Sequence, residues 1–343
     1  MPSLPDTSRE IKLKTRPHSL PQATDFEIVE VPLPVAGAAE VLVRNRYSRV
    51  SASLRMMISE GAEAVEGVPF PALRPGDTLA EETLGEVVAA PADSGLKTGD
   101  LVQHFLGWRE YAAVPVADCV RIDNQLPDPV ANLSHGWTAY AALTRGVQIR
   151  PGDTVLITSA AGAIGSMAGQ IARLLGAGRV IGSTSSKDKA DRLVDQLHYD
   201  AAVVRGHGSI TAQLQEVAPE GIDVLLDNVG GEQLQAAVGA AREGARFVLV
   251  GALSGQLASK GTGRTAPVEL DSFQLLLKKI TMRGYSADDD PDARDEWTRR
   301  FAGWLRSGSI VFPHVVLQGI ESAPEAMQKV AEGKYFGTAV VAL

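Results

Sequence analysis

A run of small residues lies between a strand-like segment and an amphipathic helical pattern over residues 163–175. Residues 160–165 read A-A-G-A-I-G, so Ala160, Gly162 and Gly165 take the three positions of a G-x-G-x-x-G/A fingerprint. Small residues let the backbone approach a pyrophosphate, and the start of a helix offers unpaired N–H groups to that anion. Because the pattern falls at the first strand–turn–helix of an alternating series, it predicts dinucleotide binding rather than only a tight turn.

The end of the next strand-like segment indicates which dinucleotide is bound. Residues 183–189 read S-T-S-S-K-D-K, so no carboxylate ends this strand. NAD enzymes usually place an acid there for the ribose 2′-hydroxyl, whereas Ser185, Ser186 and Lys189 would give charge-assisted bonds to a 2′-phosphate. The sequence therefore predicts NADP(H). The alternative interpretation is a helix N-cap at Ser186 followed by solvated lysines.

No metal site is predicted. The chain has one cysteine, and its six histidines show no ligand-like spacing. A catalytic zinc needs about three ligands and a structural zinc four. Without a Lewis acid a simple alcohol or ketone is hard to activate for hydride transfer, so we expect a substrate already activated by conjugation. Reduction of a C=C bond beside a carbonyl, or of a quinone, fits that requirement.

The elements that must position these residues fall into two domains. Short β-branched runs broken by Pro, Gly and Asp fill the first third of the chain, including 110–122, which reads as a strand. Strands and helices alternate from about residue 130, and β-rich sequence returns near 310. We expect an α/β protein with a β-rich domain over 1–128, completed by 312–343, and a parallel-sheet domain over 129–311.

Composition excludes several other classes of protein. The 343 residues carry a formal net charge of −8, which disfavours nucleic-acid binding. No apolar run reaches the roughly 20 residues of a membrane span, and residues 1–16 lack a secretory apolar core. The single cysteine, Cys119, fits a reducing cytoplasm.

Four motifs carry a resemblance along nearly the whole chain: G-W-T-A-Y (136–140), A-A-G-A-I-G-S (160–166), D-N-V-G-G (227–231) and V-G-A-L-S (250–254). The chain resembles the zinc-free medium-chain dehydrogenase/reductases, among them the leukotriene/prostaglandin reductases and NADPH-dependent alkenal double-bond reductases. The resemblance implies a GroES-like domain beside a Rossmann domain. It also implies homodimers joined through the edge of the Rossmann sheet, and hydride transfer to the β-carbon of conjugated aldehydes or ketones.

The resemblance further implies roles for individual residues. Gly162, Ala163, Ile164 and Gly165 would lie under the pyrophosphate, Lys189 would hold the 2′-phosphate, and Asn228 would bond the ribose or a phosphate. The nicotinamide half would be lined by Thr138, Val250, Ala252, Leu253, Ser254 and Tyr285.

The chain departs from the family pattern at four places. Val204-Arg205 replaces Asn-Tyr, where Arg205 could still serve the adenine and 2′-phosphate by stacking and charge. Residues 51–55 read S-A-S-L-R instead of D-P-Y-M-R, and Leu277 replaces a second tyrosine. Near the end N-x-G-K becomes Y-F-G-T, with Tyr335 expected to fill part of the space opened.

These departures leave the proton donor open. Hydride transfer to the β-carbon creates an enolate that must be stabilised and then protonated on the α-carbon. The candidates are the cofactor ribose hydroxyl, water, Tyr285 and Tyr47, and packing against the cofactor is the alternative role for Tyr285. Two other functions stay open: quinone reduction, and a non-catalytic protein that binds NADPH as a sensor.

Overall fold

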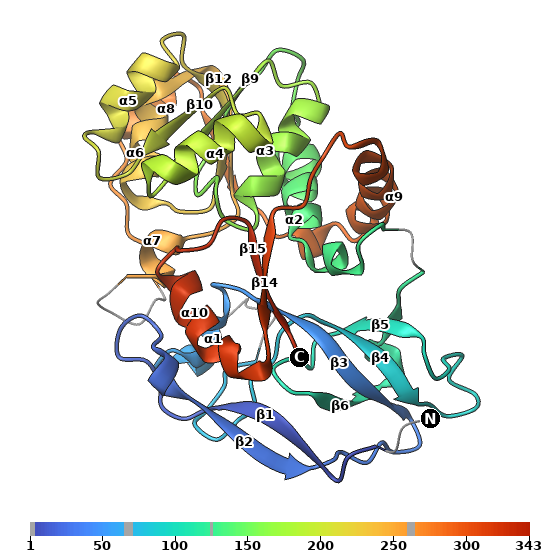
Figure 1. Cartoon of the computed structure of the whole chain (residues 1–343). Helices are drawn as coiled ribbons and strands as arrows, with labels where there is room; N and C mark the ends of the chain where they lie inside the picture. The colour runs from blue at the N-terminus through green and yellow to red at the C-terminus, as the bar shows by residue number, and fades with distance from the viewer. Residues whose placement is uncertain (1–3, 65–70, 124–125, 259–264) are drawn as a thin grey trace.

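The structure is a computed structural model that describes residues 4–64, 71–123, 126–258 and 265–343. Figure 1 shows two bodies, one β-rich and one with helices on both faces of a sheet, with both chain ends in the β-rich body. Residues 308–313 lead from the second body into the β-rich body. Residues 333–337 contact the second body again before the chain returns to the β-rich body.

The β-rich body contains a two-stranded and a seven-stranded sheet within the described residues. β1 pairs antiparallel with β2, and the larger sheet has the order β14-β15-β3-β4-β5-β7. β6 pairs with the first half of β3, on the same edge of β3 that β15 occupies further along. The strands are β1 Thr7–Leu13, β2 Phe26–Pro32, β3 Glu40–Val50, β4 Thr83–Ala89, β5 Leu101–His104, β6 Tyr111–Pro115, β7 Val120–Arg121, β14 His314–Gln318 and β15 Thr338–Ala342.

The last strand of the chain is an interior strand of this sheet. β15 lies between β14 and β3, with Ala339 opposite Val50. Residues of the preceding helix, Ala326 and Met327, are buried in one cluster with Ile11 and Leu54 from the first part of the chain. The two ends of the chain therefore share one core.

The second body is built on a parallel sheet with the order β10-β9-β8-β11-β12-β13 among the described residues. Its strands are β8 Thr154–Ile157, β9 Arg179–Thr184, β10 Ala201–Val204, β11 Ile222–Asp227, β12 Ala241–Leu249 and β13 Thr281–Gly284. The order reverses between β8 and β11, which is the topological switch point where dinucleotides bind in this fold. The predicted combination of a β-rich domain and a Rossmann domain is confirmed.

Helices flank both bodies (Figure 1). They are α1 Leu54–Ile58, α2 Gly136–Ala141, α3 Gly165–Leu174, α4 Lys187–Leu197, α5 Ile210–Val217, α6 Gly231–Ala240, α7 Leu253–Gln256, α8 Ser272–Leu277, α9 Asp292–Ser307 and α10 Ala323–Ala331. Short 3₁₀ or π turns are η1 Ala23–Asp25, η2 Ala62–Ala64, η3 Val116–Asp118, η4 Pro129–Leu133, η5 Ala142–Gly146, η6 Ala287–Asp289 and η7 Ile320–Ser322.

Two local predictions need correction. The stretch 110–122 is not one strand, because the turn η3 separates β6 from β7 and leaves Cys119 half-buried. Residues 275–282 read L-L-L-K-K-I-T-M, an apolar run whose sequence predicts a strand, but they are helical up to Leu277 and extended only from Thr281. The Asp271 carboxylate accepts bonds from the N–H groups of Phe273 and Gln274, and this N-cap starts α8 before β13 begins.

Close packing fixes α2, the helix that carries Thr138. Gly136 lies against the indole of Trp297 on α9, where any side chain at position 136 would overlap the ring. Trp297 in turn stacks on Phe301, with 4.3 Å between the ring centroids. A glycine and an aromatic stack therefore hold α2 and α9 together.

Candidate cofactor site

The fingerprint turn connects β8 to α3 in a shape that small residues require. The N–H of Ala160 donates to the Ser183 carbonyl (2.8 Å), and the N–H of Gly162 to the Ser159 carbonyl (2.9 Å). A Cβ at Gly165 would overlap the backbone of Ser159 and Ala160, so only glycine fits there. The N–H groups of Ser166 and Ala168 already donate to the carbonyls of Gly162 and Ile164. Those of Ala163, Ile164 and Gly165 have no hydrogen-bond partner among the described residues, which makes this turn suited to a pyrophosphate.

A buried hydrogen-bond network occupies the switch point. The Thr158 hydroxyl donates to Asp227 Oδ1 (2.6 Å) and accepts from the N–H of Asn228 (2.8 Å). Asp227 also accepts from the N–H groups of Val229 and Gly230, which shapes the D-N-V-G-G turn. Asp227 is therefore a structural residue of the site, a role that the motif alone did not indicate.

Asn228 presents one unused acceptor. Its Nδ2 donates to the Thr158 carbonyl (2.8 Å), which fixes the orientation of the amide. The Oδ1 atom is buried without a partner. A buried acceptor without a bond is costly, so this oxygen fits a hydroxyl of a bound ribose.

The 250–254 segment folds onto the same turn. The N–H of Val250 donates to the Asp227 carbonyl (2.8 Å), and the N–H of Leu253 to the Asn228 carbonyl (3.0 Å). The Ser254 N–H donates to the Val229 carbonyl (2.9 Å), which leaves Ala252 in the middle of the loop. The structure thus brings these predicted residues together with Asn228.

Lys189 lies in the first turn of α4, shortly after the end of β9. Its side chain is about nine-tenths buried. Its ammonium donates to the carbonyls of Tyr335 (2.7 Å) and Gly333. Burial and the nearby Arg192 lower the pKa of Lys189. A buried cation held by neutral carbonyls is a favourable partner for an anion.

The neighbouring residues agree with one part of the alternative interpretation of S-T-S-S-K-D-K, the helix N-cap. Ser186 is indeed the N-cap of α4 and accepts from the N–H of Lys189. Ser185 is exposed beside it. The N–H of Arg205 donates to the Thr184 carbonyl (2.9 Å), so Arg205 lies exposed at the same edge of the sheet.

The Tyr285 hydroxyl is hydrogen-bonded to another side chain. Its hydroxyl donates to Asp290 Oδ2 (2.7 Å), and its ring lies against Gly146. Burial and this bond raise the pKa of Tyr285 above its ordinary value. A buried phenol that already donates to a carboxylate is a poor proton donor, so the geometry favours the packing role.

The remaining predicted residues, Thr138 and Tyr47, belong to different bodies of the molecule. Thr138 is half-buried on α2. Tyr47 is on β3, opposite Leu84 and Ala342, and packs against a buried apolar cluster with Leu133.

Residues 333–337, which we name the C-terminal strap, cross from α10 to β15 (Figure 1). They lie over the fingerprint turn at 160–165, which is also called the cofactor turn below. The Gly337 N–H donates to the Ala161 carbonyl (2.9 Å). The Phe336 ring lies 3.9 Å from the guanidinium carbon of Arg192. The Tyr335 side chain packs against the apolar cluster of the β-rich body that contains Ile11 and Met327, and its hydroxyl is buried without a partner.

A buried charged cluster occupies the S-A-S-L-R segment and its surroundings. Arg49 pairs with Glu81 (3.0 Å) and Glu82 (2.7 Å), and Ser51 bonds to both Glu81 and Ser53 (2.7 Å). Burial alone would lower the pKa of Arg49, but the two glutamates raise it above its ordinary value. Sequence reasoning missed this cluster.

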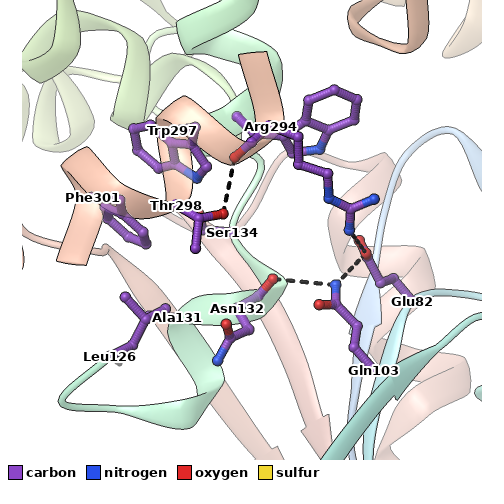
Figure 2. A pocket seen from close by; sticks show the side chains of 11 residues that line it. Glu82, Gln103, Leu126, Ala131, Asn132, Ser134, Arg294, Trp297, Thr298 and Phe301 are labelled. Carbon is purple, nitrogen blue, oxygen red and sulfur yellow. Dashed lines mark hydrogen bonds and ion pairs between the residues drawn. The ribbon is translucent and has the colours of Figure 1, made fainter. Parts of the chain in front are cut away.

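A small cavity of about 50 Å³ lies where α9 meets the β-rich body (Figure 2). Gln103 and Arg294 converge on the Glu82 carboxylate, the latter at 3.4 Å. This cavity is lined by residues of both bodies and contains none of the predicted cofactor residues.

Two features of the described ranges bear on the other expectations. Within them, no group of three or more His, Cys, Asp or Glu side chains could hold a metal ion. None of the helices there combines the length and apolar character needed to cross a membrane.

Comparison with known proteins agrees with this architecture. Residues 9–122 match the family "N-terminal domain of oxidoreductase" and residues 163–303 match "Zinc-binding dehydrogenase". The Bacillus subtilis protein YfmJ is 32% identical, with 98% of this chain and 97% of that protein covered. The NADP(+)-dependent 2-alkenal reductase of Nicotiana tabacum is 28% identical, covering 98% and 97%.

Two further proteins are similar over nearly the whole chain. The NADPH-dependent curcumin reductase of Escherichia coli is 26% identical, covering 97% of this chain and 96% of the relative. The crystal structure of CurA from Vibrio vulnificus in complex with NADPH has a TM-score of 0.87 at 30% identity, covering 97% and 98%.

The chain belongs to the medium-chain dehydrogenase/reductase family, as the resemblance predicted. It is an enzyme, an NADP-dependent oxidoreductase of that family.

Proposed function

We propose that this enzyme uses NADPH to reduce the C=C bond of α,β-unsaturated aldehydes and ketones. The proposal that NADPH is the cofactor rests on one observation, the buried ammonium of Lys189 beside a strand end without a carboxylate. The substrate half is supported by relatives named for alkenal, curcumin and pulegone reduction.

The residues fit the dinucleotide at three points. The glycine-requiring turn at 162–165 suits the pyrophosphate, the unpaired Asn228 Oδ1 suits a ribose hydroxyl, and Lys189 with Arg205 suits a 2′-phosphate. The loop 250–254 and the Tyr285 ring then bound the nicotinamide end. When bound, NADPH supplies the hydride.

The protein's own contribution is binding, orientation and control of water. Its residues place the conjugated carbonyl beside the cofactor and shield it between the two bodies. Because the Tyr285 proton is held by Asp290, we propose that the α-carbon takes its proton from water rather than from this side chain.

We also propose that the reaction needs no zinc and takes place in a reducing cytoplasm. One cysteine in the whole sequence and the scattered histidines support both statements. Metal analysis of active protein tests the first: activity with far less than one zinc per chain is expected, and stoichiometric zinc whose removal abolishes turnover would contradict it.

The function is tested with purified enzyme, NADPH and four acceptors: a 2-alkenal, an enone, a quinone and a saturated aldehyde. We expect NADPH consumption with the first two and the saturated carbonyl as product. Faster turnover of the quinone than of every conjugated carbonyl would favour quinone reduction. Tight NADPH binding without any turnover would favour the sensor.

A further inference from the structure

The ammonium of Lys189 uses two of its three hydrogen-bond donors on the C-terminal strap. It donates to the carbonyls of Gly333 and Tyr335. A lysine ammonium has three N–H groups and no acceptor. The third donor has no partner among the described residues, so one bond remains available.

The strap is attached to the Rossmann domain at three places. Besides the Lys189 bonds, Phe336 packs under Arg192, and the Gly337 N–H donates to Ala161 in the fingerprint turn. At its ends the strap continues into α10 and β15, which belong to the β-rich body. The strap therefore joins the β-rich body to the cofactor turn.

The charges around Lys189 call for an anion. Arg192 lies on the same face of α4, and Lys334 is part of the strap, and both disfavour the charged form of Lys189. Asp188, the preceding residue, favours the charged form and offsets them only in part. Both strap partners of the ammonium are neutral carbonyls. A phosphate at the third donor would relieve this accumulation of positive charge.

We propose that Lys189 is a positioning residue with two simultaneous partners, holding the strap with two N–H groups and the cofactor 2′-phosphate with the third. The phosphate then fastens the strap over the cofactor turn, and a cofactor without it does not. This inference rests on the proposed use of NADPH. Binding of the 2′-phosphate would then hold the strap, and with it the two bodies, in one arrangement. It would also strengthen cofactor binding.

The test measures amide hydrogen exchange of the strap, with two probes that differ only in the 2′-phosphate. Saturating 2′,5′-ADP should slow exchange across residues 333–338 by about tenfold, as expected for one added charge-assisted bond, and saturating 5′-AMP should not. The Gly337 amide, bonded to Ala161, is the most direct reporter.

Lys189→Met and Arg205→Ala form the matched pair of variants. Lys189→Met should speed strap exchange in the free protein by about tenfold and abolish the slowing by 2′,5′-ADP. Arg205→Ala should weaken binding of 2′,5′-ADP, yet at saturation the strap should slow as in the wild type. If Lys189→Met does not fold, Lys189→Arg serves instead, and its planar guanidinium should bind the phosphate while slowing the strap less.

Two results would overturn the inference. One of them leaves the proposed NADPH preference standing, and the other contradicts that preference as well. If 2′,5′-ADP binds more tightly than 5′-AMP but strap exchange ignores it, the coupling is wrong while the NADPH preference stands. If the two probes bind equally, the 2′-phosphate is not recognised, and the proposed cofactor preference and the coupling both fail.

Discussion

Tyr285 shows how a single bond decides between two roles at the residue scale. Because its hydroxyl donates to Asp290, we expect Tyr285→Phe to keep kcat within about threefold while lowering the free energy of unfolding by about 1 kcal/mol. Steady-state kinetics and denaturant unfolding measure the two effects. A loss of 10²–10⁴-fold in kcat, the usual value of general acid catalysis, would show that Tyr285 is the proton donor after all.

Lys189 predicts a pH dependence of cofactor choice. Burial and Arg192 lower its pKa in the free protein, and a bound 2′-phosphate would raise that pKa again. NADPH affinity should therefore decrease as the pH rises through the lowered pKa, where the free enzyme loses the ammonium proton. Fluorescence titrations above neutral pH should show this decrease for NADPH and a flatter profile for NADH. Parallel profiles for the two cofactors would argue against a role of Lys189 in phosphate binding.

At the scale of elements, Gly337 decides whether the strap can lie on the cofactor turn. Its φ is 81°, and a Cβ there would overlap the Pro313 carbonyl. We expect Gly337→Ala to lower the free energy of unfolding by about 2–4 kcal/mol, through left-handed strain plus overlap. Denaturant unfolding gives the value.

Gly333→Ala is the matched control for that substitution. Gly333 also has a positive φ, 64°, but a Cβ there would meet nothing within 4 Å. We expect a cost of only about 1 kcal/mol, from strain alone. Equal losses for both variants would mean that the strap is not held in the described position.

Most of the cofactor site could be predicted from the sequence because its elements are local. The fingerprint turn, the end of β9 and the D-N-V-G-G turn each lie within a few residues, where strand, turn and helix signals are readable. The strap bonds to Lys189 and the Arg49–Glu81 pair join residues far apart in the chain. Such contacts leave no periodic pattern, and only the tertiary fold places them.

At the scale of the whole molecule, an apolar surface among the described residues suits a second copy. β13 is one of the two edge strands of the Rossmann sheet, and beside it α8 exposes Phe273, Leu276 and Leu277 by more than half. An open edge strand with exposed apolar neighbours favours pairing. We propose a homodimer through this edge.

Charge at this surface tests the dimer. Leu276→Glu combined with Leu277→Glu should convert a dimer into a monomer in analytical ultracentrifugation, because two carboxylates would be buried in the contact. Val120→Glu, at an exposed apolar residue on β7, should leave the mass unchanged. A wild-type monomer at micromolar concentration would contradict the homodimer.

The place of β15 between β14 and β3 has a consequence for biosynthesis. Residues 338–342 are synthesised long after residues 40–50, yet they complete the interior of the sheet that residues 40–50 begin. The Rossmann body, encoded in between, has all of its strands available earlier. The middle of the nascent chain can therefore fold before its beginning, because residues 40–50 gain this partner strand only after residues 338–342 have been made.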